Sequence, residues 1–160
     1  MIPFTDRQAA GRVLGSMLLQ YRDDKDLLVL GLARGGVPVA AEVAATLSAP
    51  LDVLVVRKIG APGQPEFALG AIASGDVLSM NEEFTSSIAR SPAIAAEIMR
   101  QRADLRRREA LYRNERLPLD IRNRTVILAD DGAATGASMR AAVQAARKRG
   151  ASRVIAAVPV

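Results

Sequence analysis

A short apolar run followed by two adjacent carboxylates constrains the fold of this chain more than any other feature. Residues 126–129 are all apolar, as in a parallel strand that is buried on both faces. Asp130 and Asp131 follow where that strand should end. A loop of Gly and Ala comes next, and Thr135 and Ser138 then open a helical pattern. In an open α/β sheet, ligands bind beyond the carboxyl ends of the strands, so this segment predicts an α/β fold with a ligand site here.

The same segment carries the groups that a sugar phosphate requires. Carboxylates accept hydrogen bonds from sugar hydroxyls or hold a hard metal ion, and free backbone N–H groups at the start of a helix bind phosphate. There are two alternatives: receiver domains also place paired acids at strand ends, and two acids can simply cap a turn. Receiver domains have no Thr-Gly-x-Ser loop directly after the acids, so the motif favours the sugar phosphate.

The first half of the chain contains a similar strand end. Residues 27–32 have the pattern of a buried strand, and Ala33-Arg34-Gly35-Gly36 follows directly. Two glycines permit a close approach of the backbone to a ligand, although such pairs often only make turns. A helical pattern then leads to another strand at residues 51–56, so we expect a parallel strand–helix–strand unit. Arg34, Gly35 and Gly36 should therefore lie at the same sheet edge as Asp130.

Arg57 and Lys58 follow the strand at residues 51–56. The Arg fork and the Lys point charge suit phosphate oxygens, and the alternative is a basic pair that extends into solvent. The glycines and prolines of residues 57–66 predict a mobile loop, and residues 67–73 and 77–81 predict a hairpin. Glu66 is a candidate base or metal-shell acid, or simply a solvated side chain.

The remaining patterns complete a single α/β domain over residues 1–160. We expect an open, mainly parallel twisted sheet with helices on both faces and a Rossmann-like core. The predicted helices cover residues 6–21, 92–114 and 136–149, and residues 153–160 predict a last strand. Thr5 and Gln8 form a capping-box pattern for the first helix, and its Met17 and Leu18 are expected in the core.

Composition narrows the chemistry. The chain has no Cys and no His, so any metal should be a hard, oxygen-bound ion such as Mg²⁺. Its N-terminus lacks the pattern of a signal peptide and no apolar run is long enough to cross a membrane, so we expect a cytoplasmic protein. A net charge of +5 suits an anionic ligand or nucleic acid. Aromatics are only 3%, which argues against stacking on single-stranded nucleic acid, and the arginines of residues 100–116 indicate a solvated helix face.

The strand, the two acids, the small-residue loop, Thr-Gly and the further Ser resemble the signature of the type I phosphoribosyltransferases. In that family the acids hold the ribose hydroxyls of phosphoribosyl pyrophosphate, and the loop wraps its 5′-phosphate. The resemblance therefore assigns the ribose to Asp130 and Asp131. The loop around the phosphate would comprise Gly132, Ala133, Ala134, Thr135, Gly136, Ala137 and Ser138.

The resemblance reaches from about residue 27 to residue 160 and gives the other two motifs a role. By this resemblance, residues 34–36 form a loop that faces the pyrophosphate through Arg34 and the backbone N–H groups of Gly35 and Gly36. Adenine phosphoribosyltransferases carry a similar Arg-Lys pair ahead of a flexible lid. By this likeness Arg57 and Lys58 would bind pyrophosphate oxygens, and residues 59–69 would close over a reactive sugar.

The implied activity is Mg²⁺-dependent transfer of ribose 5-phosphate from phosphoribosyl pyrophosphate to a nitrogen acceptor such as a nucleobase, as in nucleotide salvage. Mg²⁺ would bridge the pyrophosphate and the ribose hydroxyls, and Asp130 and Asp131 would act on it indirectly, through the hydroxyls or water. Catalysis would be electrostatic, with the two acids near the positive sugar and Arg34 and Lys58 near the leaving group.

Two departures from the family pattern leave the acceptor open. Ala134 stands where hypoxanthine-guanine enzymes carry an Asp that can act on the base, and the sequence stops before the segment that usually completes a hood over it. The alternatives are a regulatory module that binds phosphoribosyl pyrophosphate without turnover and, ranked below it, a nucleic-acid-binding protein. Because many relatives are dimers, a homodimer is expected.

Overall fold

Four parallel strands form the central sheet of the structure, a computed structural model that describes residues 4–88 and 90–159. In sheet order they are β2 (Leu51–Leu54), β1 (Leu27–Leu32), β6 (Thr125–Ala129) and β7 (Arg153–Ala157). Every residue of β1 and β6 is buried, which explains their continuous apolar runs. The predicted α/β fold with a parallel sheet is confirmed. The last strand ends at Ala157, earlier than predicted, and residue 160 lies outside the described residues.

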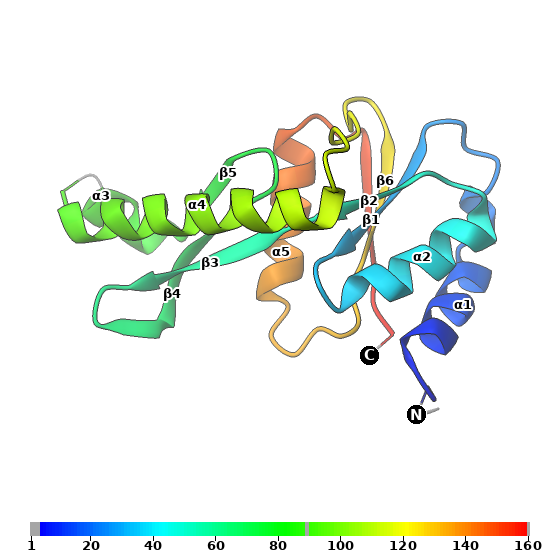
Figure 1. The fold of residues 1–160 in the computed structure, drawn as a ribbon, viewed down its shortest axis with the longest axis horizontal. Helices are drawn as coiled ribbons and strands as arrows, with labels where there is room; N and C mark the ends of the chain where they lie inside the picture. Colours follow the sequence, from blue (N-terminus) through cyan, green and yellow to red (C-terminus); the bar gives the residue numbers. More distant parts are fainter. Residues whose placement is uncertain (1–3, 89, 160) are drawn as a thin grey trace.

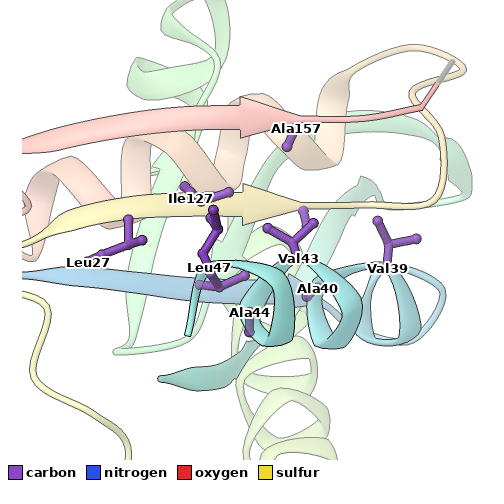
Figure 2. Packing of buried hydrophobic residues seen from close by; sticks show 10 residues of the cluster. Leu27, Val39, Ala40, Val43, Ala44, Leu47, Ile127 and Ala157 are labelled. Carbon is purple, nitrogen blue, oxygen red and sulfur yellow. The ribbon is translucent and has the colours of Figure 1, made fainter. Parts of the chain in front are cut away.

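Helices cover both faces of this sheet (Figure 1). On one face, α2 (Gly36–Leu47) packs Val43 and Leu47 against Leu27 of β1 and its neighbours (Figure 2). On the other face, α5 (Ala137–Lys148) packs against Leu28 and the adjacent buried strand residues. Successive strand residues point to opposite faces, so the neighbours Leu27 and Leu28 belong to different clusters.

Helix α1 (Arg7–Met17) approaches α2 closely at a glycine, beside the partly buried side chain of Leu14. A Cβ at Gly15 would lie 2.7 Å from the Cβ of Thr46, so only glycine permits this close approach. The predicted core position of Met17 is wrong, because 69% of that residue is exposed. Asp6 rather than Thr5 caps the helix, and its side chain accepts a hydrogen bond from the backbone N–H of Ala9 at 2.7 Å. A short 3₁₀ turn, η1 (Leu19–Tyr21), follows.

A second sheet extends from the end of β2 and corrects two predictions. The predicted strand at 51–56 breaks at Val55, and Arg57 and Lys58 lie inside a new strand instead of after the old one. The antiparallel sheet consists of β3 (Val56–Ala61), β4 (Gln64–Ala73) and β5 (Val77–Met80). The predicted loop at 57–66 is therefore a hairpin, and the predicted hairpin at 67–81 is confirmed. Gly60 sits at a register shift, where a Cβ would lie 2.6 Å from the Pro65 carbonyl oxygen.

A long helix, α4 (Pro92–Arg113), lies against this second sheet (Figure 1). The short elements η2 (Glu82–Phe84) and α3 (Thr85–Ile88) precede it. Its apolar face places Ile94, Ile98 and Leu105 against the side chains of β3 and β4. Its arginines pair with acids, as in Arg108 with Asp104, so the predicted solvated helix face is confirmed. Within the described residues, no helix is long and apolar enough to span a membrane.

Candidate functional site

The paired acids stand at the carboxyl end of β6, in the middle of the parallel sheet. The backbone N–H of Asp131 donates to Asp130 Oδ1 at 2.9 Å. Burial raises the pKa of the Asp130 carboxyl and the Asp131 carboxylate adds to the rise, whereas the Asp131 N–H opposes it. Two neighbouring carboxylates held in this way give the sheet edge a concentrated negative charge that suits sugar hydroxyls.

The loop after β1 packs directly on these acids. A Cβ at Gly35 would lie 2.3 Å from Asp131 Oδ2, and one at Gly36 would lie 2.4 Å from the Ala129 carbonyl oxygen. Both glycines are therefore required by the contact between the two loops, and the predicted meeting of these loops at one sheet edge is confirmed. Arg34 is exposed beside them, and the Ala33–Arg34 peptide bond is cis.

The small-residue loop leads from the acids into α5. Gly136 caps that helix with a φ of 71°, and the backbone N–H of Ala137 donates to Thr135 Oγ1 at 3.3 Å. Residues 132–138 of the loop border a cavity of about 250 Å³ together with Lys58 and Asp130. Since the first backbone N–H groups of a helix have no partner inside it, this cavity has the donors that a phosphate needs.

Lys58 and Arg57 turn to opposite faces of β3, because neighbouring strand residues alternate. Lys58 borders the loop cavity. Arg57 Nε instead lies 2.9 Å from Asp104 Oδ2 in a salt bridge and donates to Gln101 Oε1 at 3.1 Å, and both partners are on α4. The structure thus brings Lys58, but not Arg57, to the small-residue loop of residues 132–138. Glu66 is exposed on the β3–β4 hairpin.

Arg7 is a residue of this site that the sequence did not reveal. Its Nε and Nη2 atoms each lie 2.8 Å from Asp131 Oδ2. Together with Arg34 and Tyr112 it borders a second cavity of about 640 Å³ beside Asp131. No spacing rule connects two residues that are 124 positions apart, so only the packing of α1 on α2 could have placed Arg7 here.

A further cavity of about 400 Å³ is also bordered by Arg7 and Asp131. Its walls are mainly apolar, with Phe4, Val39 and Pro159 among them. It has no counterpart among the sequence predictions, because its residues come from segments that are far apart in the sequence, from Phe4 to Pro159.

The donor set at the sheet edge fits Mg²⁺ only in part. Asp130 and Asp131 supply hard carboxylate oxygens, the ligand type that Mg²⁺ prefers. Among the residues that the structure describes, no group of three or more His, Cys, Asp or Glu could hold a metal ion. A Mg²⁺ ion at this site would therefore need oxygens from a bound phosphate or sugar and from water.

A parallel sheet whose carboxyl edge combines paired acids, a glycine loop and a helix N-terminus defines an α/β protein with a ligand site at its strand ends. The family model of the phosphoribosyl transferase domain matches residues 4–160, and the chain belongs to that family.

Two proteins of Mycobacterium tuberculosis, named provisionally as phosphoribosyl transferases, are 46% identical to this chain over 158 residues, or 98% of it. The chain spans 35% of their length. The crystal structure of TT1426 from Thermus thermophilus is 44% identical, has a TM-score of 0.84, and matches 98% of this chain and 74% of its own. A purine phosphoribosyltransferase from Pyrococcus horikoshii is 18% identical, with a TM-score of 0.55 and coverage of 98% and 73%, and shares the fold.

Proposed function

We propose that the chain binds phosphoribosyl pyrophosphate and transfers its ribose 5-phosphate to a nitrogen acceptor, with release of pyrophosphate. The observation that carries this proposal is the direct packing of Gly35 and Gly36 on Asp130 and Asp131. It brings the glycine loop and the pair of acids together at the sheet edge from which the small-residue loop leads into α5, and these three parts would hold the pyrophosphate, the ribose and the 5′-phosphate of the donor.

Each part of the donor has a matching group. The 5′-phosphate binds the N–H groups at the start of α5, with Lys58 supplying a positive charge. The ribose hydroxyls donate to Asp130 and Asp131. The pyrophosphate lies along the N–H groups of Gly35 and Gly36, next to Arg34 in the cavity that Asp131 also borders. We leave Arg57 out of this set, because Asp104 and Gln101 already hold its guanidinium.

Mg²⁺ would be held by the pyrophosphate and ribose oxygens, with Asp130 and Asp131 beside it. When bound, it would neutralise charge on the pyrophosphate and make it a better leaving group. Asp130 and Asp131 orient the ribose for this arrangement, whether they face the ion directly or through water.

The reaction breaks the bond between C1 of the ribose and the pyrophosphate oxygen, and the electron pair leaves with pyrophosphate. The lone pair of the acceptor nitrogen forms the new bond to C1, and that nitrogen then releases its proton to solvent. Asp130 and Asp131 stabilise the positive charge that develops on the sugar, while Arg34 stabilises the negative charge on the leaving group and Lys58 holds the 5′-phosphate in place. These charges are fixed before the reaction starts, so little reorganisation is needed.

The mainly apolar cavity next to Asp131 is our candidate for the acceptor site. Phe4, Val39 and Pro159 offer surfaces for a planar ring, and Asp6 and Arg7 add polar groups at its border. A volume of about 400 Å³ suits a small heterocycle. A nitrogen heterocycle is therefore the acceptor class that this cavity supports best.

Calorimetric titration of phosphoribosyl pyrophosphate, with and without Mg²⁺, tests the donor site. We expect binding that requires Mg²⁺ and weakens about 100-fold in the Asp130→Asn/Asp131→Asn variant, since charge-assisted hydrogen bonds are lost. Asp23→Asn, which removes an exposed carboxylate in the turn before β1, is the control and should bind normally. Absence of binding by the folded chain would refute the proposal. Binding without pyrophosphate release, across a panel of nitrogen heterocycles, would instead indicate a regulatory binding module.

A further inference from the structure

A cavity of about 230 Å³ between the second sheet and α5 has no role in the proposed reaction. It lies on the face of β3, β4 and β5 that meets α5, whereas α4 covers the opposite face (Figure 1). It continues from the phosphate loop along the first turns of α5, away from the acids. The side chains around it show what it can bind.

Cations border this cavity without acids. Lys58 and Arg140 are among its lining residues, and no carboxylate is among those that the structure describes there. Arg140 donates from Nη1 to the Thr135 carbonyl oxygen at 3.1 Å, which holds its guanidinium next to the phosphate loop. Two cations that converge on one hollow without a counter-charge indicate an anionic ligand.

The pairing of the three strands sets Lys58, Ala71 and Ser79 in one row, each directly opposite the next. Residues opposite one another in antiparallel strands point to the same face of the sheet. Ala71 in the middle carries only a methyl group between Lys58 and Ser79, and all three residues border the cavity. The next row, Arg57, Ile72 and Leu78, turns to α4.

Ser79 supplies the second, independent observation. Its hydroxyl oxygen is buried and has no hydrogen-bond partner in the part of the chain that the structure describes. A buried hydroxyl without a partner is unfavourable, and such groups in proteins usually serve a ligand or an ordered water. In this cavity the hydroxyl can donate to an anion that Lys58 and Arg140 attract.

We propose that this cavity binds the phosphate group of a small phosphomonoester, at a site separate from the one for the donor. Lys58 and Ser138 border both this cavity and the phosphate-loop cavity, so the two sites are coupled. A phosphate here draws the Lys58 ammonium away from the loop and places a second negative charge close to the donor's 5′-phosphate. The coupling rests on the proposed function, but the phosphate site itself does not.

Inorganic phosphate is the probe for the site, with backbone amide NMR signals as the readout. The signals of Ala71, Ser79 and Gln144 report this cavity, and those of Gly132 and Thr135 report the phosphate loop. We expect two sets of shifts with separate affinities. Arg140→Gln should weaken the first set about tenfold or more, through the loss of a charge-assisted hydrogen bond. Arg147→Gln, which removes an exposed arginine from the same helix, is the matched control.

Ser79→Ala separates a ligand role from a structural one. Because the hydroxyl has no partner, its removal should leave the melting temperature unchanged or raise it, while phosphate binding at the cavity weakens several-fold. The proposal is wrong if phosphate shifts only the loop signals, if Arg140→Gln and Arg147→Gln titrate alike, or if Ser79→Ala binds phosphate normally.

The coupling has its own test. Phosphate should weaken the binding of phosphoribosyl pyrophosphate more in the wild type than in Ser79→Ala, and an equal effect in both would refute the coupling. If phosphoribosyl pyrophosphate binds neither protein, the proposed function fails, and the NMR titration still decides whether the phosphate site exists.

Discussion

Gly35 is the residue on which the site geometry depends most directly. The Asp131 carboxylate occupies the space that a side chain at this position would need, with Oδ2 only 2.3 Å from where a Cβ would stand. The sequence predicted that this glycine pair lets the backbone approach a ligand closely. The structure shows a different reason, namely that two loops from separate strands meet without room for a methyl group.

Gly35→Ala should therefore displace the Asp131 carboxylate. We expect the affinity for phosphoribosyl pyrophosphate to fall about tenfold or more and the free energy of unfolding to fall by about 1–3 kcal/mol, as for other overpacked sites. Calorimetry and urea denaturation measure the two effects. Ala45→Ser adds one heavy atom at an exposed position of α2 and should change neither. Normal donor affinity in Gly35→Ala would show that the contact between the loops does not position the acid.

The raised pKa of the Asp130 carboxyl leads to a second prediction about a single residue. The folded chain binds a proton at this carboxyl more tightly than the unfolded chain does, so ionisation of Asp130 destabilises the fold as the pH rises through the folded pKa. Asp130→Asn removes that penalty and keeps an oxygen that can accept from the Asp131 N–H. At pH 7 the variant should be more stable by on the order of 1 kcal/mol, a typical gain at a functional site.

Urea denaturation between pH 4 and pH 7 tests this sign. The stability advantage of Asp130→Asn should shrink as the pH falls toward about 4, where the unfolded carboxyl also takes up a proton. A variant that is less stable than the wild type at pH 7 would mean that the Asp130 carboxylate stabilises the fold.

The helices and strands with a strong hydrophobic periodicity in the sequence were predicted well. The central strands are buried on both faces and therefore read as apolar runs, and α4 and α5 carry clear caps and helical spacing. The β3–β4 hairpin was predicted as a loop because its glycines and prolines interrupt any alternation. Main-chain pairing between the two strands, rather than side-chain pattern, defines it. The same holds for the candidate site. The motifs at the strand ends could be recognised in the sequence, whereas the contact between Arg7 and Asp131 could not.

The packing of α1 on α2 gives the prediction at this scale. The first helix packs Leu14 against the core beside its partner, and Gly15 lets the two helices approach closely at Thr46. Gly15→Leu should lower the free energy of unfolding by about 1–3 kcal/mol through overpacking. Met17→Ala, at the position wrongly expected in the core, should change it by less than about 0.5 kcal/mol. Equal losses of unfolding free energy in the two variants would mean that Met17 lies in the core, as the sequence predicted.

In the molecule as a whole, the donor site draws on both sheets. The acids and the two loops belong to the parallel sheet, whereas Lys58 comes from the antiparallel one, and only Val55 separates the end of β2 from the start of β3. α4 ties the two sheets together, since Arg113 Nη2 donates to the Val53 carbonyl oxygen at 2.8 Å and Arg57 pairs with Asp104. Donor binding should therefore stabilise the entire fold rather than one loop.

Thermal unfolding with phosphoribosyl pyrophosphate and Mg²⁺ tests this idea and the roles of two adjacent residues. At a donor concentration of about 100 times its Kd, linkage gives about 2.7 kcal/mol, or roughly 5–10 °C in Tm for a chain of this size. Lys58→Gln should keep the ligand-free Tm and lose most of the shift. Arg57→Gln should do the opposite, lowering the ligand-free Tm through its lost bonds to α4 and keeping the shift. If Arg57→Gln instead loses the shift at an unchanged Tm, then Arg57 leaves α4 to bind the pyrophosphate, as its resemblance to the adenine enzymes predicted.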